Sequence, residues 1–111
     1  MNAIHECEIN NAEDENGNPT GGSVSGVGLS IDWQNGPLGR GPERKAPNGA
    51  FVETVISAAL QRIQWYQTAG KEKFKCRENA IAITKLEEAL LWLDKRTKDR
   101  EARQVEGTHT K

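Results

Sequence analysis

The chain has 111 residues, of which 35% are hydrophobic and 28% are charged. This length leaves room for one small domain and excludes a multi-domain enzyme, and the composition is that of a globular rather than a disordered chain. No apolar run approaches the ~20 residues of a membrane-spanning helix. The start of the chain has no basic region followed by an apolar stretch, so we expect a cytosolic location.

The charges are distributed unevenly along the chain. Residues 1–39 carry acidic groups and no Lys or Arg, whereas residues 40–111 hold all 15 basic groups. The net charge of the whole chain is −1. An acidic first part beside a basic second part favours pairing between the two, or anion binding on the basic side. Cys7 and Cys76 form no CxxC motif, so both are expected to be reduced and structural, without a metal site.

The first 35 residues are predicted to form a β-ribbon. Apolar and polar residues alternate over Gly26–Trp33 and again around Cys7 and Ile9, which is typical of half-buried strands. The stretch Glu13–Gly22 between them is polar and is predicted to be a long acidic loop. The result is an antiparallel hairpin or small sheet. An isolated hairpin is only marginally stable in water, so we expect it to pack against another part of the protein.

A loop is predicted over residues 36–48, because Gly36–Gly49 contains four Gly and three Pro. It is either a plain linker or a shaped loop. Arg40 and Arg44 lie where glycines let the backbone approach a ligand closely, so they are candidate binding residues.

Two helices are predicted to follow, over residues 49–69 and 77–103, with Asn48 as the N-cap of the first. The first has an apolar stripe at helical spacing: Val52, Val55, Ile56, Ala59, Leu60 and Ile63. The second has one apolar seam of Ile83, Leu86, Leu90 and Leu93, and a second strip of Ala82, Ala89 and Trp92. Two helices joined by a short loop predict an antiparallel hairpin, and the fold class is therefore α+β.

The second helix is long for so small a domain. About 27 residues at ~1.5 Å each span some 40 Å, and its apolar surface exceeds what one partner helix covers. We therefore expect the chain to form a homo-oligomer through its helices.

Catalysis is not expected from these residues. His5 and His109 lie near opposite termini, and the adjacent Glu87 and Glu88 point in different directions on a helix. No phosphate-cradling GxxxxGK[ST] motif occurs. We predict no catalytic residues and no cofactor.

Anion binding is better supported. Asn79 and Arg77 lie in the first turn of the second helix, where free N–H groups and the helix dipole favour phosphate oxygens. Tyr66, near the end of the first helix, could offer its ring to a base, although it fits equally well as a cap on the helix interface. From these residues alone we predict a helical hairpin oligomer that binds an anion.

Longer stretches of the sequence resemble a known family. The run CRENAIAITKLEEALLWL at residues 76–93, with VEGTHT at 105–110, is similar to the C-terminal hairpin of the phage Thoeris anti-defence 1 proteins. WQNGPLGRG at 33–41 and PNGAFV at 47–52 resemble the same family, so the resemblance covers residues 25–111. Anti-CBASS 2 sponges share the hairpin more distantly.

The resemblance implies a non-catalytic phage sponge, a protein that sequesters an immune signal without degrading it, acting in the cytoplasm of the infected bacterium. Such proteins are oligomers, typically hexamers, that hold cyclic ADP-ribose isomers made by TIR-domain proteins, such as glycocyclic ADP-ribose. Some also hold cyclic di- or trinucleotides of CBASS defences at a second site. The chain would thereby block Thoeris and CBASS immunity.

The resemblance also implies site residues. Tyr66 falls at the aromatic that stacks on the base, Asn79 at the amide of the Arg-Glu-Asn motif and Arg96 at the phosphate-binding arginine. Arg77 and Arg100 complete the predicted set, and Arg40 or Arg44 is the candidate for a second site. Two positions depart from the family pattern. The loop Thr68–Lys75 is longer, so Trp65 is the alternative to Tyr66, and Gln104 stands where Gly is expected.

Two other classes remain open on the sequence alone. A structural or adaptor oligomer would use the hairpin without needing Asn79 or Arg96. A small nucleic-acid-binding protein would use the basic second half, but the net charge and the interspersed acids argue against a duplex-binding surface. We therefore expect neither DNA nor a membrane as a partner.

Overall fold

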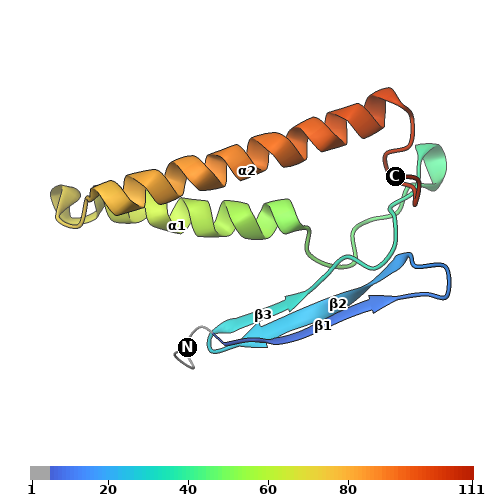
Figure 1. Ribbon diagram of the computed structural model, residues 1–111, viewed down its shortest axis with the longest axis horizontal. Coiled ribbons are helices and arrows are strands. Elements are labelled where there is room, and N and C mark those ends of the chain that lie inside the picture. Colours follow the sequence, from blue (N-terminus) through green and yellow to red (C-terminus); the bar gives the residue numbers. More distant parts are fainter. Residues whose placement is uncertain (1–5) are drawn as a thin grey trace. The chain divides into compact units, whose positions relative to one another are not determined.

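The computed structural model describes residues 6–111 and divides the chain into two compact units (Figure 1). The first unit runs up to Phe51 and includes the C-terminal segment Glu101–Lys111, and the second is Val52–Arg100. His5, which the sequence analysis considered, lies outside the described residues. Over the described part of the chain, neither helix is both long and apolar enough to span a bilayer.

The first unit contains a three-stranded antiparallel sheet of β1 (Glu8–Glu13), β2 (Pro19–Gly26) and β3 (Leu29–Asp32), in that order. The α+β class is thus confirmed, but the long loop predicted over Glu13–Gly22 is wrong, because β2 begins inside it. The central strand was missed because its Gly and Ser residues give no apolar alternation. Gly22 allows the close approach of the strands, since a Cβ there would lie 2.1 Å from the Asn10 carbonyl oxygen.

The register places apolar side chains on one face of the sheet. Ile9 pairs with Val24, and Val24 pairs with Ile31, so the three form a row across the strands. The row one residue along consists of Asn10, Ser23 and Asp32, which lie on the opposite, polar face. The alternation that predicted β1 and β3 therefore describes a two-faced sheet. The prediction that these strands are half-buried is wrong for β1, all of whose residues are exposed, and in β3 only Ile31 is half-buried.

The strand predicted over Gly26–Trp33 is shorter in the structure, because the turn between β2 and β3 interrupts it. Gly26 pairs with Leu29, so Val27 and Gly28 form a two-residue turn, with Gly28 at φ 73°. Val27 is accordingly 81% exposed rather than part of the apolar face.

The Gly/Pro-rich segment is a closed loop whose two ends are hydrogen-bonded to each other. Trp33 bridges Ala50, and the Asn48 side chain accepts from the Asn35 N–H at 2.8 Å and donates to the Asn35 carbonyl at 3.1 Å. Asn48 is therefore occupied in closing the loop and does not cap a helix at residue 49 as predicted. The first helix, α1 (Val52–Glu72), begins three residues later.

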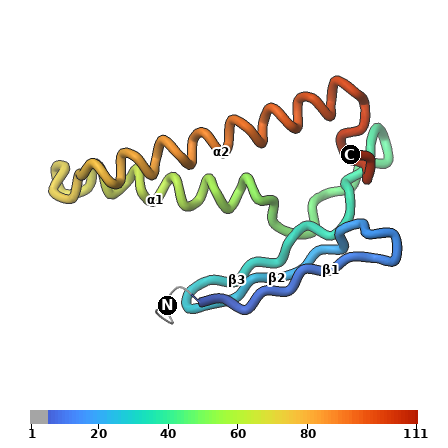
Figure 2. Tube along the Cα trace, in the orientation of Figure 1, coloured from blue at the N-terminus to red at the C-terminus, as the bar shows by residue number. Residues whose placement is uncertain are grey.

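The second unit consists of α1 and all but the last two residues of α2 (Arg77–Ala102). The two helices are joined by a turn and diverge away from it (Figure 2). Helical geometry in α1 is interrupted at Ala69, and Gly70, Lys71 and Glu72 have positive φ. The predicted apolar positions are half-buried in both helices, namely Val55, Ile56, Leu60 and Ile63 in α1 and Ile83, Leu86, Leu90 and Leu93 in α2. The exceptions include Trp92, which is 67% exposed.

No side chain in the part of the chain that the structure describes is fully buried. Close contacts between elements link β1 with β2 and β2 with β3, whereas the two helices are not packed as closely against each other. A single chain thus has half-covered apolar faces and no closed core.

Candidate functional site

An aromatic and cationic cluster lies on one face of α1. The Trp65 and Tyr66 rings meet edge to face with centroids 5.3 Å apart. The Arg62 guanidinium carbon lies 4.5 Å from the Trp65 ring centroid and 4.9 Å from that of Tyr66. Both rings remain accessible, with Trp65 50% and Tyr66 38% exposed. The structure therefore places Tyr66 and its alternative, Trp65, in one cluster, where each ring leaves surface on which a base can stack.

Asn79 and Arg77 lie in the first turn of α2. Arg77 is its first residue and is exposed, and Asn79 is half-buried. The backbone N–H groups of this turn have no partner one turn earlier in the helix, and the helix dipole adds partial positive charge there. This end of α2 can accept an anionic group.

A side-chain amide joins the ends of the two helices. Gln67 donates from Nε2 to the Cys76 carbonyl at 3.1 Å, and its Oε1 accepts from the Cys76 N–H at 3.0 Å. Cys76 directly precedes α2, and its carbonyl also accepts from the Ala80 N–H at 3.2 Å. The Gln67 amide thus holds the end of α1 that carries Tyr66 beside the end of α2 that carries Asn79.

The predicted phosphate-binding arginine lies far from that end. Arg96 is exposed near the other end of α2 and makes no hydrogen bond or ion pair with any described residue. Its axial distance from Asn79 along the uninterrupted helix is about 25 Å, at ~1.5 Å per residue. Arg100, one turn further on, is half-buried. One chain therefore does not bring Asn79 and Arg96 together.

The two arginines proposed for a second site differ in their surroundings. Arg44 makes a two-pronged ion pair with Glu106, from Nη1 to Oε2 at 2.7 Å and from Nη2 to Oε1 at 3.0 Å. These bonds raise the pKa of Arg44 and hold the C-terminal segment against the loop. Arg40, at the start of the 3₁₀ turn Gly41–Glu43, is exposed and has no ion pair among residues 6–111.

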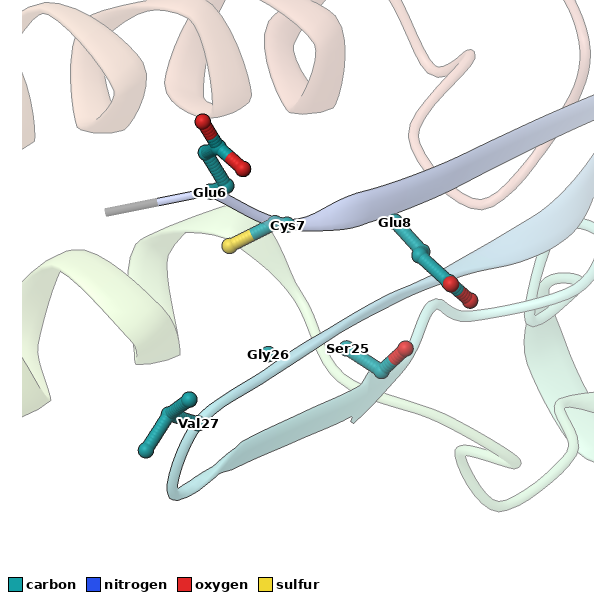
Figure 3. Close-up of a pocket in the computed structure, with 6 residues that line it drawn as sticks. All are labelled: Glu6, Cys7, Glu8, Ser25, Gly26 and Val27. Atoms are coloured by element: carbon teal, nitrogen blue, oxygen red, sulfur yellow. The ribbon is translucent and has the colours of Figure 1, made fainter. Parts of the chain in front are cut away.

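A separate hollow of about 570 Å³ lies at one end of the sheet and is lined by six residues (Figure 3): Glu6, Cys7, Glu8, Ser25, Gly26 and Val27. The figure shows the Cys7 sulfur beside Gly26, close to the β2–β3 turn. Two carboxylates and no cation line this hollow, so its charge disfavours the phosphate-bearing ligand that the sequence predicts.

These site elements lie within a stretch that matches a known family. The profile of the Acb2/Tad1 hairpin domain matches residues 28–98. The chain belongs to this family. The match includes α1 and most of α2, and thus Arg62, Tyr66, Asn79 and Arg96, but it ends before Arg100.

A curated relative in the Acb2/Tad1 family gives the same result. The chain is 48% identical over 82 residues to a protein of Bacillus phage SBSphiJ7 named Thoeris anti-defense 1. The alignment covers 74% of this chain and 53% of the relative, so the chain spans about half the length of the protein it matches. The resemblance to the Thoeris anti-defence 1 proteins is thus confirmed.

Sequence reasoning missed Arg62. A signal was available, because the positions three and four residues away on both sides of Arg62 are Ala or aromatic, so no carboxylate lies on its helix face. An arginine whose neighbours on the helix face are only Ala or aromatic residues has no carboxylate with which to form a surface ion pair.

Proposed function

We propose that this protein is a phage anti-defence sponge that binds TIR-derived cyclic ADP-ribose isomers, such as glycocyclic ADP-ribose, and holds them without degrading them. Acting in the cytoplasm of the infected host, it keeps the Thoeris effector from being switched on. The family membership and the name of the phage relative support an anti-defence role. The chemistry of the hairpin supports a nucleotide as the ligand.

The observation that carries this proposal is the arrangement of the hairpin turn. Accessible Trp65 and Tyr66 rings offer faces for an adenine, and the half-buried Asn79 amide lies at the same end of the hairpin because Gln67 binds Cys76. Arg77 adds a positive charge to the first turn of α2. A ring, an amide and a guanidinium are the groups that recognise a base and its phosphates.

The site is proposed to be shared between chains. With Asn79 and Arg96 about 25 Å apart on one helix, a compact ligand reaches both only if Arg96 comes from an antiparallel partner. The half-covered apolar faces of α1 and α2 and the exposed Leu91 and Trp92 support such assembly. By family resemblance, the assembly is a homo-oligomer, expected to be a hexamer.

A second ligand class is proposed for the Gly/Pro-rich loop. Some relatives by resemblance hold cyclic di- or trinucleotides at a separate site, for which Arg40 and Arg44 are the candidates. Because Glu106 already neutralises Arg44, Arg40 is the guanidinium that a second phosphate would meet first. Binding there would extend the protection to CBASS immunity.

A sponge must bind more tightly than an enzyme that turns its ligand over. Sequestration requires a dissociation constant well below the concentration of the signal, so nanomolar affinity, about −12 kcal/mol, is the expected order. A base stacked between chains and several charge-assisted phosphate bonds are sufficient in kind to supply it.

The decisive experiment incubates the protein with TIR-derived cyclic ADP-ribose isomers and with cyclic di- and trinucleotides. The protein is then separated, heat-denatured, and the released molecules are identified by chromatography. Intact release of a bound nucleotide supports the sponge. Release of altered products would show an enzyme, and absence of any bound nucleotide would contradict the proposal.

Variants separate the sponge from the alternative classes. Arg96→Ala is expected to abolish nucleotide binding and leave the oligomer intact, whereas Lys98→Ala, a matched change whose lysine pairs with Asp94 at 2.9 Å, leaves binding unchanged. In a structural or adaptor oligomer, neither substitution would change the function. A nucleic-acid-binding protein would instead bind random DNA with a steep salt dependence.

A further inference from the structure

Arg62 is an isolated charge on an otherwise neutral helix surface. Between Thr54 and Gly70, α1 contains no other charged residue. The other cations on the helical hairpin with carboxylate partners include Lys75, Lys85 and Lys98, which lie 3.6, 3.9 and 2.9 Å from Glu72, Glu88 and Asp94. Arg62 makes neither an ion pair nor a hydrogen bond with any residue in the described range. Its charge is therefore not neutralised by this chain.

The aromatic neighbours of Arg62 contact its guanidinium without neutralising its charge. Its guanidinium lies over Trp65 and Tyr66, with the carbon 4.5 and 4.9 Å from the two ring centroids. These cation–π contacts neutralise no charge, and because Arg62 makes no hydrogen bond with a described residue, its N–H donors remain available to an acceptor. An anion is the acceptor that a guanidinium binds most strongly.

A hollow lies next to this guanidinium. Its volume is about 310 Å³, and Ala58, Gln61, Arg62 and Trp65 line it. All four residues belong to α1, so this one helix fixes the position of the hollow relative to the backbone of Arg62. The volume is at the lower end of the range of small-molecule sites, and Gln61 adds an amide that can donate or accept a hydrogen bond.

We propose that Arg62 is an additional ligand-binding residue, whose guanidinium edge hydrogen-bonds a phosphate oxygen of the nucleotide that stacks on the Trp65–Tyr66 pair. This inference rests on the proposed function, which it deepens. The cluster then binds both parts of a nucleotide from one chain, with the base on an open ring and a phosphate at the guanidinium beside it. Arg96 of a neighbouring chain serves the remaining phosphate.

The test compares Arg62→Gln with the full-length wild type, using calorimetry with a TIR-derived cyclic ADP-ribose isomer at 50 and 500 mM NaCl. Arg62→Gln is expected to weaken binding about tenfold or more at low salt and to reduce the loss of affinity at high salt, because one charge contact is gone. Lys85→Gln removes a helix cation that is paired with Glu88 and serves as the control. Its affinity is expected to stay within twofold of the wild type.

The outcomes are distinguishable. If Arg62→Gln binds within twofold of the wild type, the inference fails and the sponge proposal stands. If its affinity falls but the salt dependence is unchanged, Arg62 only positions the rings, and the phosphate contact is refuted. If the wild type itself binds no isomer, the proposed function fails and this inference fails with it. Arg62→Lys keeps the charge without the planar fork and is expected to bind with intermediate affinity, which guards against a folding defect in the glutamine variant.

Discussion

The side chain of Gln67 replaces a backbone segment in its contact with Cys76. Its amide accepts from the Cys76 N–H at 3.0 Å and donates to the Cys76 carbonyl at 3.1 Å, as a neighbouring peptide group would. This pairing crosses a turn that contains three consecutive residues with positive φ, Gly70, Lys71 and Glu72. One glutamine therefore fixes how α1 leads into α2, and with it the end of the hairpin where Tyr66 and Asn79 lie.

Removing this amide is expected to destabilise the hairpin. Gln67→Ala loses two partly exposed hydrogen bonds and is expected to lower the free energy of unfolding by about 1 kcal/mol. Gln64→Ala, on the same helix and with no hydrogen bond to another described side chain, controls for the gain in helix propensity. The two variants are compared by urea denaturation followed by circular dichroism. Equal stability of the two would show that the Gln67 pairing contributes nothing.

The ion pair between Arg44 and Glu106 is expected to hold the C-terminal segment on the loop. Glu106→Gln weakens a partly exposed pair, so its effect on global stability is expected to be at most about 1 kcal/mol. The local effect is larger, because Gly39 donates its N–H to the Gly107 carbonyl next to the ion pair at 2.9 Å. Hydrogen exchange of the Gly39 amide is expected to accelerate in Glu106→Gln. The swapped pair Arg44→Glu with Glu106→Arg should restore slow exchange, and failure of both effects would argue against this role.

The turn after α2 contains a residue that a glycine would suit better. Gln104 has φ 61°, a left-handed conformation that costs a side chain about 1 kcal/mol and costs glycine almost nothing. Gln104→Gly is therefore expected to stabilise the protein by a few tenths to about 1 kcal/mol in thermal unfolding.

Gly107 gives the opposite control in the same segment. It has φ 80°, and a Cβ there would lie 2.4 Å from the Gly39 carbonyl oxygen. Gly107→Ala is expected to destabilise the protein by more than Gln104→Gly stabilises it. A stabilised Gly107→Ala protein would contradict the described backbone.

The loop between β1 and β2 is expected to loosen in acid. The Asp14 carboxylate accepts from the Asn18 and Asn16 backbone N–H groups, at 3.0 and 2.8 Å, and these bonds hold the pKa of Asp14 below its ordinary value. A lowered folded-state pKa means that the stabilisation is present above the unfolded pKa and is lost as the pH falls through the folded one. The protection factors of the Asn16 and Asn18 amides, which are NMR exchange rates corrected for the intrinsic pH dependence of exchange, are expected to fall as the pH drops through that window. In Asp14→Asn that response should disappear, and a response that persists would assign it to another group.

Regular periodicity predicted the helices and two of the strands, because their apolar residues repeat along one face. The start of α2 at Arg77 and the seam through Ile83 and Leu86 were readable for this reason. Strand β2 was not, since its pairing depends on the backbone approach that Gly22 permits rather than on side-chain alternation. Asn48 was misread because a local N-cap pattern competes with a long-range bond to Asn35 that the sequence does not reveal.

The candidate site shows the same division. Asn79 was identified from its place in the first helical turn, which is a local property. The Arg62 cluster depends on side-chain geometry along α1 and was not predicted. The separation of Asn79 from Arg96 was predictable, because it requires only the continuous helix that the sequence predicts over residues 77–103 and that α2 confirms. Pairing between chains was expected from the length and the apolar surface of the second helix, and it stays a proposal, which the separation of Asn79 from Arg96 and the half-covered apolar faces support.

The central claim is that each ligand is held by Asn79 of one chain and Arg96 of another. The most direct test co-expresses Asn79→Ala and Arg96→Ala chains with different tags, purifies the mixed oligomers through both tags, and counts tight binding sites by calorimetry. Each variant alone is expected to bind none. Random mixing in a shared-site assembly restores about a quarter of the sites, since each restored site takes its intact Asn79 and Arg96 from different chains. Mixed oligomers without a single restored tight site would contradict the account.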